Sequence, residues 1–201
     1  VGDVNIDVSA GGDVSADIDY RITYSGTDDT LGNITVGDIN LTVEDDAAVD
    51  FDAVFVATGN SLGDLTIGDI SVIGSSLSLN ATADVLDFTV SALVAEDMGD
   101  VTVGDITVVL ADQQVGNMAV LVGSITDDAG DMTVGDVSVT VGDDSSFYLS
   151  LSLNATGSAG DITVGDITLN LGDEVTSGDV VVSAIAGDGD ITLGDIAISG
   201  T

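Results

Sequence analysis

One eight-residue phrase recurs along the chain at intervals of about 30 residues. It joins a Gly-Asp pair, a hydrophobic-Thr-hydrophobic triplet and a second Gly-Asp pair, as in GDVTVGDI and GDITVGDI. The second Asp of the phrase, taken as a marker, recurs every 29 to 36 residues at Asp3, Asp38, Asp69, Asp105, Asp136, Asp166 and Asp195. Self-similarity at such a period is the signature of a repeat architecture. We therefore interpret residues 1–201 as a single repeat array.

Within each repeat, apolar and polar residues alternate in the manner of short β-strands. In one copy Ile162 and Val164 flank Thr163, and the alternation resumes at Ile167 after a Gly-Asp pair. Period-two alternation of β-branched residues is the strand signal. Across Gly-Asp, successive apolar residues are three positions apart rather than two. In a continuous strand this shift would move the following apolar side chains to the opposite face. We therefore expect a corner at each Gly-Asp, with Gly permitting the bend.

A third alternating strand follows in most repeats, as at residues 14–24 and 147–153. The segment 75–98 is longer, so we place its extra residues in a bulge or loop, and the segment 112–129 has the least regular pattern. The chain thus predicts an all-β fold: a β-solenoid (β-helix) of about six to seven ~30-residue coils with three short strands per coil. An antiparallel β-sandwich is the alternative. It ranks second because its strands need not repeat one phrase.

Stacked coils place equivalent residues in columns. The first residue of the triplet would form an interior column at Ile34, Leu65, Val101, Met132, Ile162 and Ile191. The Thr of the triplet would form an exterior column at Thr35, Thr66, Thr102, Thr133, Thr163 and Thr192. The first corner would align Asn33, Asp64, Asp100, Asp131, Asp161 and Asp190, and the second corner the markers from Asp38 to Asp195.

The charge balance limits the partners of the chain. It holds 36 Asp and Glu against a single basic residue, for a net charge of -35. Nucleic acids and anionic membrane surfaces both require cations on the protein, so neither is expected as a partner. No apolar run approaches the 18 or so residues of a membrane span. The charged partners that remain are metal cations and cationic surface components.

Catalysis is not expected from this composition. The chain has no His, no Cys and one Arg, so imidazole acid-base catalysis, thiol nucleophiles and phosphate clamps are missing. Two carboxylates could run a glycosidase, but choosing one pair among 36 acidic residues would be arbitrary. We therefore predict that the chain is not an enzyme.

The aspartate columns are the sharpest candidate site. Like charges about 4.8 Å apart repel by about 0.9 kcal/mol even at the dielectric constant of water. Backbone N–H groups, salt, low pH or bound cations must offset that repulsion, so a capping role and a cation-binding role both stay open. Hard cations such as Ca²⁺ favour carboxylate oxygens at turns. The predicted metal ligands are Asp38, Asp69, Asp105, Asp136, Asp166, Asp195, Asp100, Asp131, Asp161 and Asp190.

Gly-Asp turns followed by alternating apolar strands resemble the secreted β-solenoid repeats of bacterial and archaeal adhesins, and more loosely the calcium-binding RTX repeats. The RTX unit is nine residues long, G-G-x-G-x-D-x-U-x, and no segment here matches it, so no binding residue is transferred. The resemblance implies a secreted, stacked and cation-dependent architecture, located outside the cell or at its surface. In such a location the sequons at Asn80, Asn154, Asn33 and Asn40 are candidate glycosylation sites.

Both ends of the array lack a cap. The chain begins inside a copy of the phrase and finishes on the equivalent strand, and unpaired strand edges invite further strands. We therefore expect a structural subunit of an extracellular filament or surface layer that polymerises head to tail with itself. A stalk segment of a larger calcium-dependent adhesin is one alternative. An ice-binding solenoid that uses the Thr column is the other.

Overall fold

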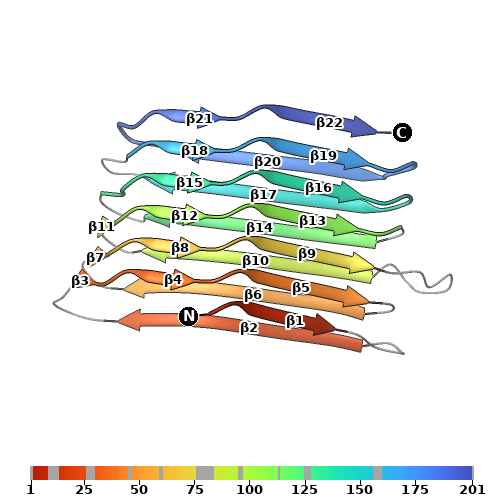
Figure 1. Cartoon of the computed structure of the whole chain (residues 1–201), viewed down its shortest axis with the longest axis horizontal. Helices are drawn as coiled ribbons and strands as arrows, with labels where there is room; N and C mark the ends of the chain where they lie inside the picture. The colour runs from red at the N-terminus through yellow and green to blue at the C-terminus, as the bar shows by residue number, and fades with distance from the viewer. Residues whose placement is uncertain are drawn as a thin grey trace.

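The chain winds as a stack of flattened coils, one above the other (Figure 1). The computed structural model describes residues 2–8, 14–25, 30–44, 47–58, 61–75, 84–94, 97–112, 114–124, 128–155 and 160–200. Within these ranges every element is a β-strand. Every strand pair between them is parallel. The fold is therefore an all-β solenoid, as the repeat predicts, and the antiparallel sandwich is excluded.

Two sheets lie end to end along one wall of the stack (Figure 1). Sheet D collects the hydrophobic-Thr-hydrophobic triplets: β4 (Ile34–Val36), β8 (Leu65–Ile67), β12 (Val101–Val103), β15 (Met132–Val134), β18 (Ile162–Val164) and β21 (Ile191–Leu193). Sheet A collects the strands after the second corner: β1 (Val4–Val8), β5 (Ile39–Glu44), β9 (Ile70–Ser75), β13 (Ile106–Leu110), β16 (Val137–Val141), β19 (Ile167–Leu171) and β22 (Ile196–Gly200).

A third sheet forms the opposite wall (Figure 1). Sheet B contains β2 (Val14–Ser25), β6 (Ala47–Thr58), β10 (Asp84–Val94), β14 (Gln114–Ser124), β17 (Ser146–Ala155) and β20 (Ser177–Ile185). Sheet C is a short ladder just before the first corner, made of β3 (Thr30–Leu31), β7 (Ser61–Leu62) and β11 (Asp97–Met98). Each coil thus passes through D, A and B in turn before it rises to the next.

Equivalent residues of the phrase stay in register from coil to coil. Thr102, for example, pairs with Thr66 below it and Thr133 above it. The strands of sheets A and D keep nearly constant length while the repeat length varies, so the turns and sheet B absorb the difference. The predicted columns are therefore real features of the fold.

The core lies between the two walls. Alternate residues of sheets D and A, such as Leu65 and Ile106, are fully buried. Phe147 and Leu149 of sheet B are buried in the same core. Most of the predicted interior column is buried, but Ile34 is half-buried and Ile191 is 47% exposed. Both exceptions lie near the ends of the stack, where one side has no covering coil among the described residues.

Two details differ from the sequence prediction. The third strand is long rather than short, at 9 to 12 residues in sheet B. The segment 112–129, expected to be the least regular, contains β14, which pairs with both neighbouring strands along its length. Its pattern is hidden because Gly116 occupies an inward position against Leu110 and Phe147. The extra residues of segment 75–98 fall mostly at 76–83, outside the described residues, so the predicted bulge or loop is not described.

The part of the chain that the structure describes contains no helix long and apolar enough to cross a membrane.

Candidate functional site

The Asp of each second corner caps the coil that follows it. Its Oδ1 accepts the backbone N–H of the equivalent Asp one coil later. Residues about 30 positions apart in the sequence therefore form one hydrogen-bonded column. The N–Oδ1 distances are 2.8 to 3.0 Å from Asp38 to Asp195 and 3.3 Å where Asp3 caps Asp38. We call this series, from Asp3 to Asp195, the second-corner column.

The first corner repeats the arrangement. Asp100, Asp131 and Asp161 each accept the N–H of the next member at 2.9 to 3.0 Å. The column begins with Asn33, whose Oδ1 accepts the N–H of Asp64 at 3.1 Å and whose Nδ2 donates to Asp64 Oδ2 at 2.9 Å. An amide thus replaces a carboxylate here without loss of the backbone bond. We call this series, from Asn33 to Asp190, the first-corner column.

A third column lies outside the recurring phrase, and its alignment was not predicted. Asp112, Asp143 and Asp173 lie at the turn between sheets A and B, and each later member donates its N–H to the earlier one at 2.7 to 2.9 Å. The repeated pairs Gly142-Asp143 and Gly172-Asp173 carry the same signal as the corners. No hydrophobic-Thr-hydrophobic triplet follows these pairs, so they do not belong to the phrase.

The corner glycines make room for these carboxylates. A Cβ built on Gly68, Gly104, Gly135 or Gly165 would lie closer than 3.0 Å to the Asp of the preceding coil. Among the described residues no glycine has a positive φ, so the corners do not require glycine for its backbone angles. Glycine is required because the Asp side chain crosses the space that a Cβ would fill.

The hydrogen bonds support the capping role of the aspartates. The predicted ligands are exposed and form rows with one carboxylate per coil and corner. Within the described part of the chain, no group of three or more His, Cys, Asp or Glu side chains is placed to hold one metal ion. Cation binding between coils, by the second oxygen of each carboxylate, stays a prediction.

The four sequons have different surroundings. Asn33 Nδ2 donates a hydrogen bond to Asp64 Oδ2, and Asn40 Nδ2 donates one to Asn5 Oδ1 at 2.9 Å. Both amide nitrogens are therefore hydrogen-bonded to a neighbouring coil. Asn154 lies near the end of β17, half-buried, and its buried Oδ1 accepts no hydrogen bond. Asn80 lies outside the described residues. Of the three described sequons, Asn154 is thus the one whose Nδ2 is not tied to a side chain of a neighbouring coil.

The Thr column is aligned as predicted, from Thr35 to Thr192 along sheet D. Its members are exposed or half-buried. The neighbouring outward positions of sheet A change from Asn40 through Ser71 to Ala197, so this face carries one regular Thr row. The ice-binding alternative stays untested.

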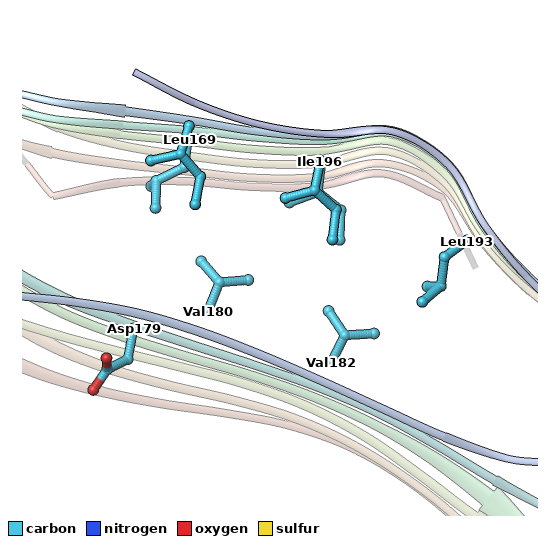
Figure 2. Close-up of a pocket in the computed structure, with 8 residues that line it drawn as sticks. Leu169, Asp179, Val180, Val182, Leu193 and Ile196 are labelled. Carbon is cyan, nitrogen blue, oxygen red and sulfur yellow. The ribbon is translucent and has the colours of Figure 1, made fainter. Parts of the chain in front are cut away.

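The core is open at the C-terminal end of the described stack. Ile196 and Ile198 are 61% and 68% exposed, whereas Ile167 and Leu169, one coil earlier, are 3% exposed. A cavity of about 430 Å³ opens there. In Figure 2, Leu169, Ile196 and Leu193 point from one wall toward Val180 and Val182 on the other, and the Asp179 carboxylate points away.

These features define a parallel β-solenoid repeat protein with aspartate-capped corners. No protein-family model, curated protein or solved structure matches the chain.

Proposed function

We propose that the chain is a structural subunit of an extracellular filament or surface layer, in which solenoids join end to end. The observation that carries the proposal is the parallel register of equivalent coils, which lets a further coil continue each sheet, and the core is accessible to such a coil at the C-terminal end of the described stack. Ile191, Leu193, Ile196 and Ile198 are 47 to 68% exposed there, beside a cavity lined almost wholly by apolar side chains. A contiguous apolar surface of this kind marks an interaction site.

At an end-to-end contact, burial of apolar surface and repulsion between corner carboxylates act in opposite directions. Covering four half-exposed aliphatic side chains stabilises the contact by roughly 1 kcal/mol each. The backbone groups of the edge strands would also gain partners. Repulsion between corner carboxylates costs about 0.9 kcal/mol for each neighbouring pair in water and less in salt. Two corner columns therefore oppose the contact by less than the apolar surface favours it.

Cations are proposed partners of the same assembly. Each corner carboxylate that is followed by another coil accepts a backbone N–H with Oδ1, and we propose that hard cations such as Ca²⁺ bridge the remaining oxygens of adjacent coils. Such bridging would lower the repulsion within a subunit and across the junction.

Sedimentation and electron microscopy test the proposal. The 201-residue chain should form linear oligomers at high salt, and the double variant Ile196→Asp/Ile198→Asp should stay monomeric. Ser199→Asp is the matched control, because it adds charge to the outward face of the same strand. A monodisperse monomer at high salt would contradict the filament, and the stalk segment of a larger adhesin would replace it.

A further inference from the structure

The outer face of sheet A is uncharged across its inner strands. In β5, β9, β13, β16 and β19, two outward side chains of each strand are described, and all of them are exposed or half-buried. They are Asn40, Thr42, Ser71, Ile73, Thr107, Val109, Ser138, Thr140, Thr168 and Asn170. We call these ten residues the sheet A face. In a chain with 36 acidic residues, such a surface stands apart from the rest of the molecule.

The other two walls bring charge to their surfaces. On sheet B the described outward residues include Asp50, Asp52 and Asp179. Sheet D is one outward Thr wide, and the first-corner and second-corner columns border it on its two sides. Among these surfaces, the sheet A face is therefore the one through which two copies with a net charge of -35 approach with the least repulsion.

The centre of the sheet A face is apolar. Ile73 and Val109 are aligned in neighbouring strands and are 40% and 36% exposed. Thr42 and Thr140 continue the same column on either side with further β-branched side chains. Both β9 and β13 have a sheet A neighbour on each side, so this exposure does not depend on a missing coil. Adjacent apolar side chains at a surface mark an interaction site.

We propose that filaments of this chain pair side by side, with the sheet A face of one filament against the sheet A face of another. The proposal rests on the end-to-end assembly proposed above. A second copy fits this face because its columns repeat at the same strand spacing, so a contact made at one coil recurs at the others. Rows of aligned side chains on two such sheets can interdigitate.

The size of the face decides which species pair. Five strands about 4.8 Å apart, each of about five residues at about 3.3 Å, cover roughly 400 Å² per copy. Two single subunits would thus bury roughly 800 Å², which is less than the roughly 1,000 Å² of a stable interface. Two filaments make the contact once per subunit, and linked weak contacts reinforce one another. Single subunits should therefore stay unpaired, whereas filaments should form bundles.

The remaining charge lies along the two edges of the face. The second-corner column borders one edge, and Asp112, Asp143 and Asp173 border the other. Packed sheets are about 10 Å apart, which equals the Debye length of about 10 Å at 0.1 M salt and exceeds the length of about 3 Å at 1 M. Repulsion between the edges of two paired faces is therefore screened at high salt, and pairing should need it.

Electron microscopy of the 201-residue chain in about 1 M NaCl tests the pairing. The wild-type chain should form bundled filaments that pellet at low speed. Val109→Asp should form single filaments of unchanged length that stay mostly in the supernatant, because it places like charges at the centre of the contact. Tyr148→Asp is the matched control, since Tyr148 is 41% exposed on the outer face of sheet B, and it should leave the bundles intact.

Thermal melts establish that the variants fold. If Val109→Asp lowers the melting temperature, Thr140→Asp repeats the test at an exposed polar position of the same column. Bundles that persist in the folded variants would overturn the pairing and leave end-to-end assembly standing. Single wild-type filaments at every salt concentration would also overturn it, and would leave another molecule as the occupant of the face. Wild-type chains that stay monomeric at high salt would overturn the proposed function itself.

Discussion

A corner aspartate in this fold acts first as a hydrogen-bond acceptor. Its Oδ1 accepts a backbone N–H that the corner would otherwise leave without a strand partner. Asn33 makes the same bond without a charge. The negative charge is therefore not needed for capping, and it adds repulsion along the column.

We predict that Asp105→Asn keeps or raises the melting temperature at low salt. The amide retains the acceptor for Asp136 N–H and removes two repulsive neighbours, as Asn33 does at the end of the first-corner column. Asp105→Ala should cost about 1 kcal/mol, because it loses the acceptor at a solvated corner. Thermal melts at two salt concentrations check both variants. Equal melting temperatures for the Ala and Asn variants would refute the capping role.

We predict that Gly135→Ala destabilises the fold by about 1–3 kcal/mol, as overpacking does. Its Cβ would collide with Asp105 of the preceding coil. Gly2→Ala is the matched control, because a Cβ there meets nothing within 4 Å, and it should change stability by less than about 0.5 kcal/mol. Denaturant unfolding measures both values. A similar loss for the two variants would point to a backbone effect of glycine instead.

At the level of strands, local alternation predicts the strands that belong to the recurring phrase and predicts less well the strands of the variable segments between copies. The triplets and the corners recur in sequence, so the strands of sheets A and D and their register followed from alternation alone. In sheet B the alternation at residues 14–24 gave nearly the whole of β2, whereas the alternation at residues 147–153 gave only part of β17. The sequence did not show β14 clearly, because Gly116 occupies an inward position and interrupts the apolar pattern. The same glycine leaves room for Phe147.

The candidate site, too, could be predicted only in part from the sequence. The two corner columns followed from the phrase, whereas the partner of each carboxylate did not. Asp38 Oδ1 bonds to the backbone of Asp69, and only the stacked geometry brings that N–H close. The space that this bond requires explains the neighbouring glycines better than their backbone freedom does.

The Gly116–Phe147 pair provides a prediction for neighbouring strands. A Cβ on Gly116 would approach Leu110 Cδ1 to 2.6 Å and Phe147 Cδ2 to 3.3 Å. Gly116→Ala should therefore destabilise by about 1–3 kcal/mol. Adding Phe147→Leu should cost less in the Gly116→Ala background than in the wild-type chain, because the smaller side chain relieves the crowding. A double-mutant cycle measures this coupling, and strictly additive effects would contradict it.

At the level of the whole molecule, a net charge of -35 opposes a compact fold. We predict that monovalent salt raises the melting temperature at neutral pH, because it screens the exposed columns. Melts in NaCl, in CaCl₂ at matched ionic strength and in EDTA provide the measurement. A further rise with Ca²⁺ that EDTA reverses would support bound cations. A melting temperature insensitive to all three would show that the backbone bonds alone offset the charge.

Every capping carboxylate reaches in the same direction, toward the coil that follows it in the chain. The C-terminal face of the described stack therefore presents the capping carboxylates of Asp190 and Asp195, whereas at the opposite face the group in the second-corner column that a carboxylate would cap is the backbone N–H of Asp3. A filament that continues these bonds is polar, and its two tips differ chemically. Subunits should add at different rates at the two tips, and a fragment that blocks one tip should leave the other free to grow.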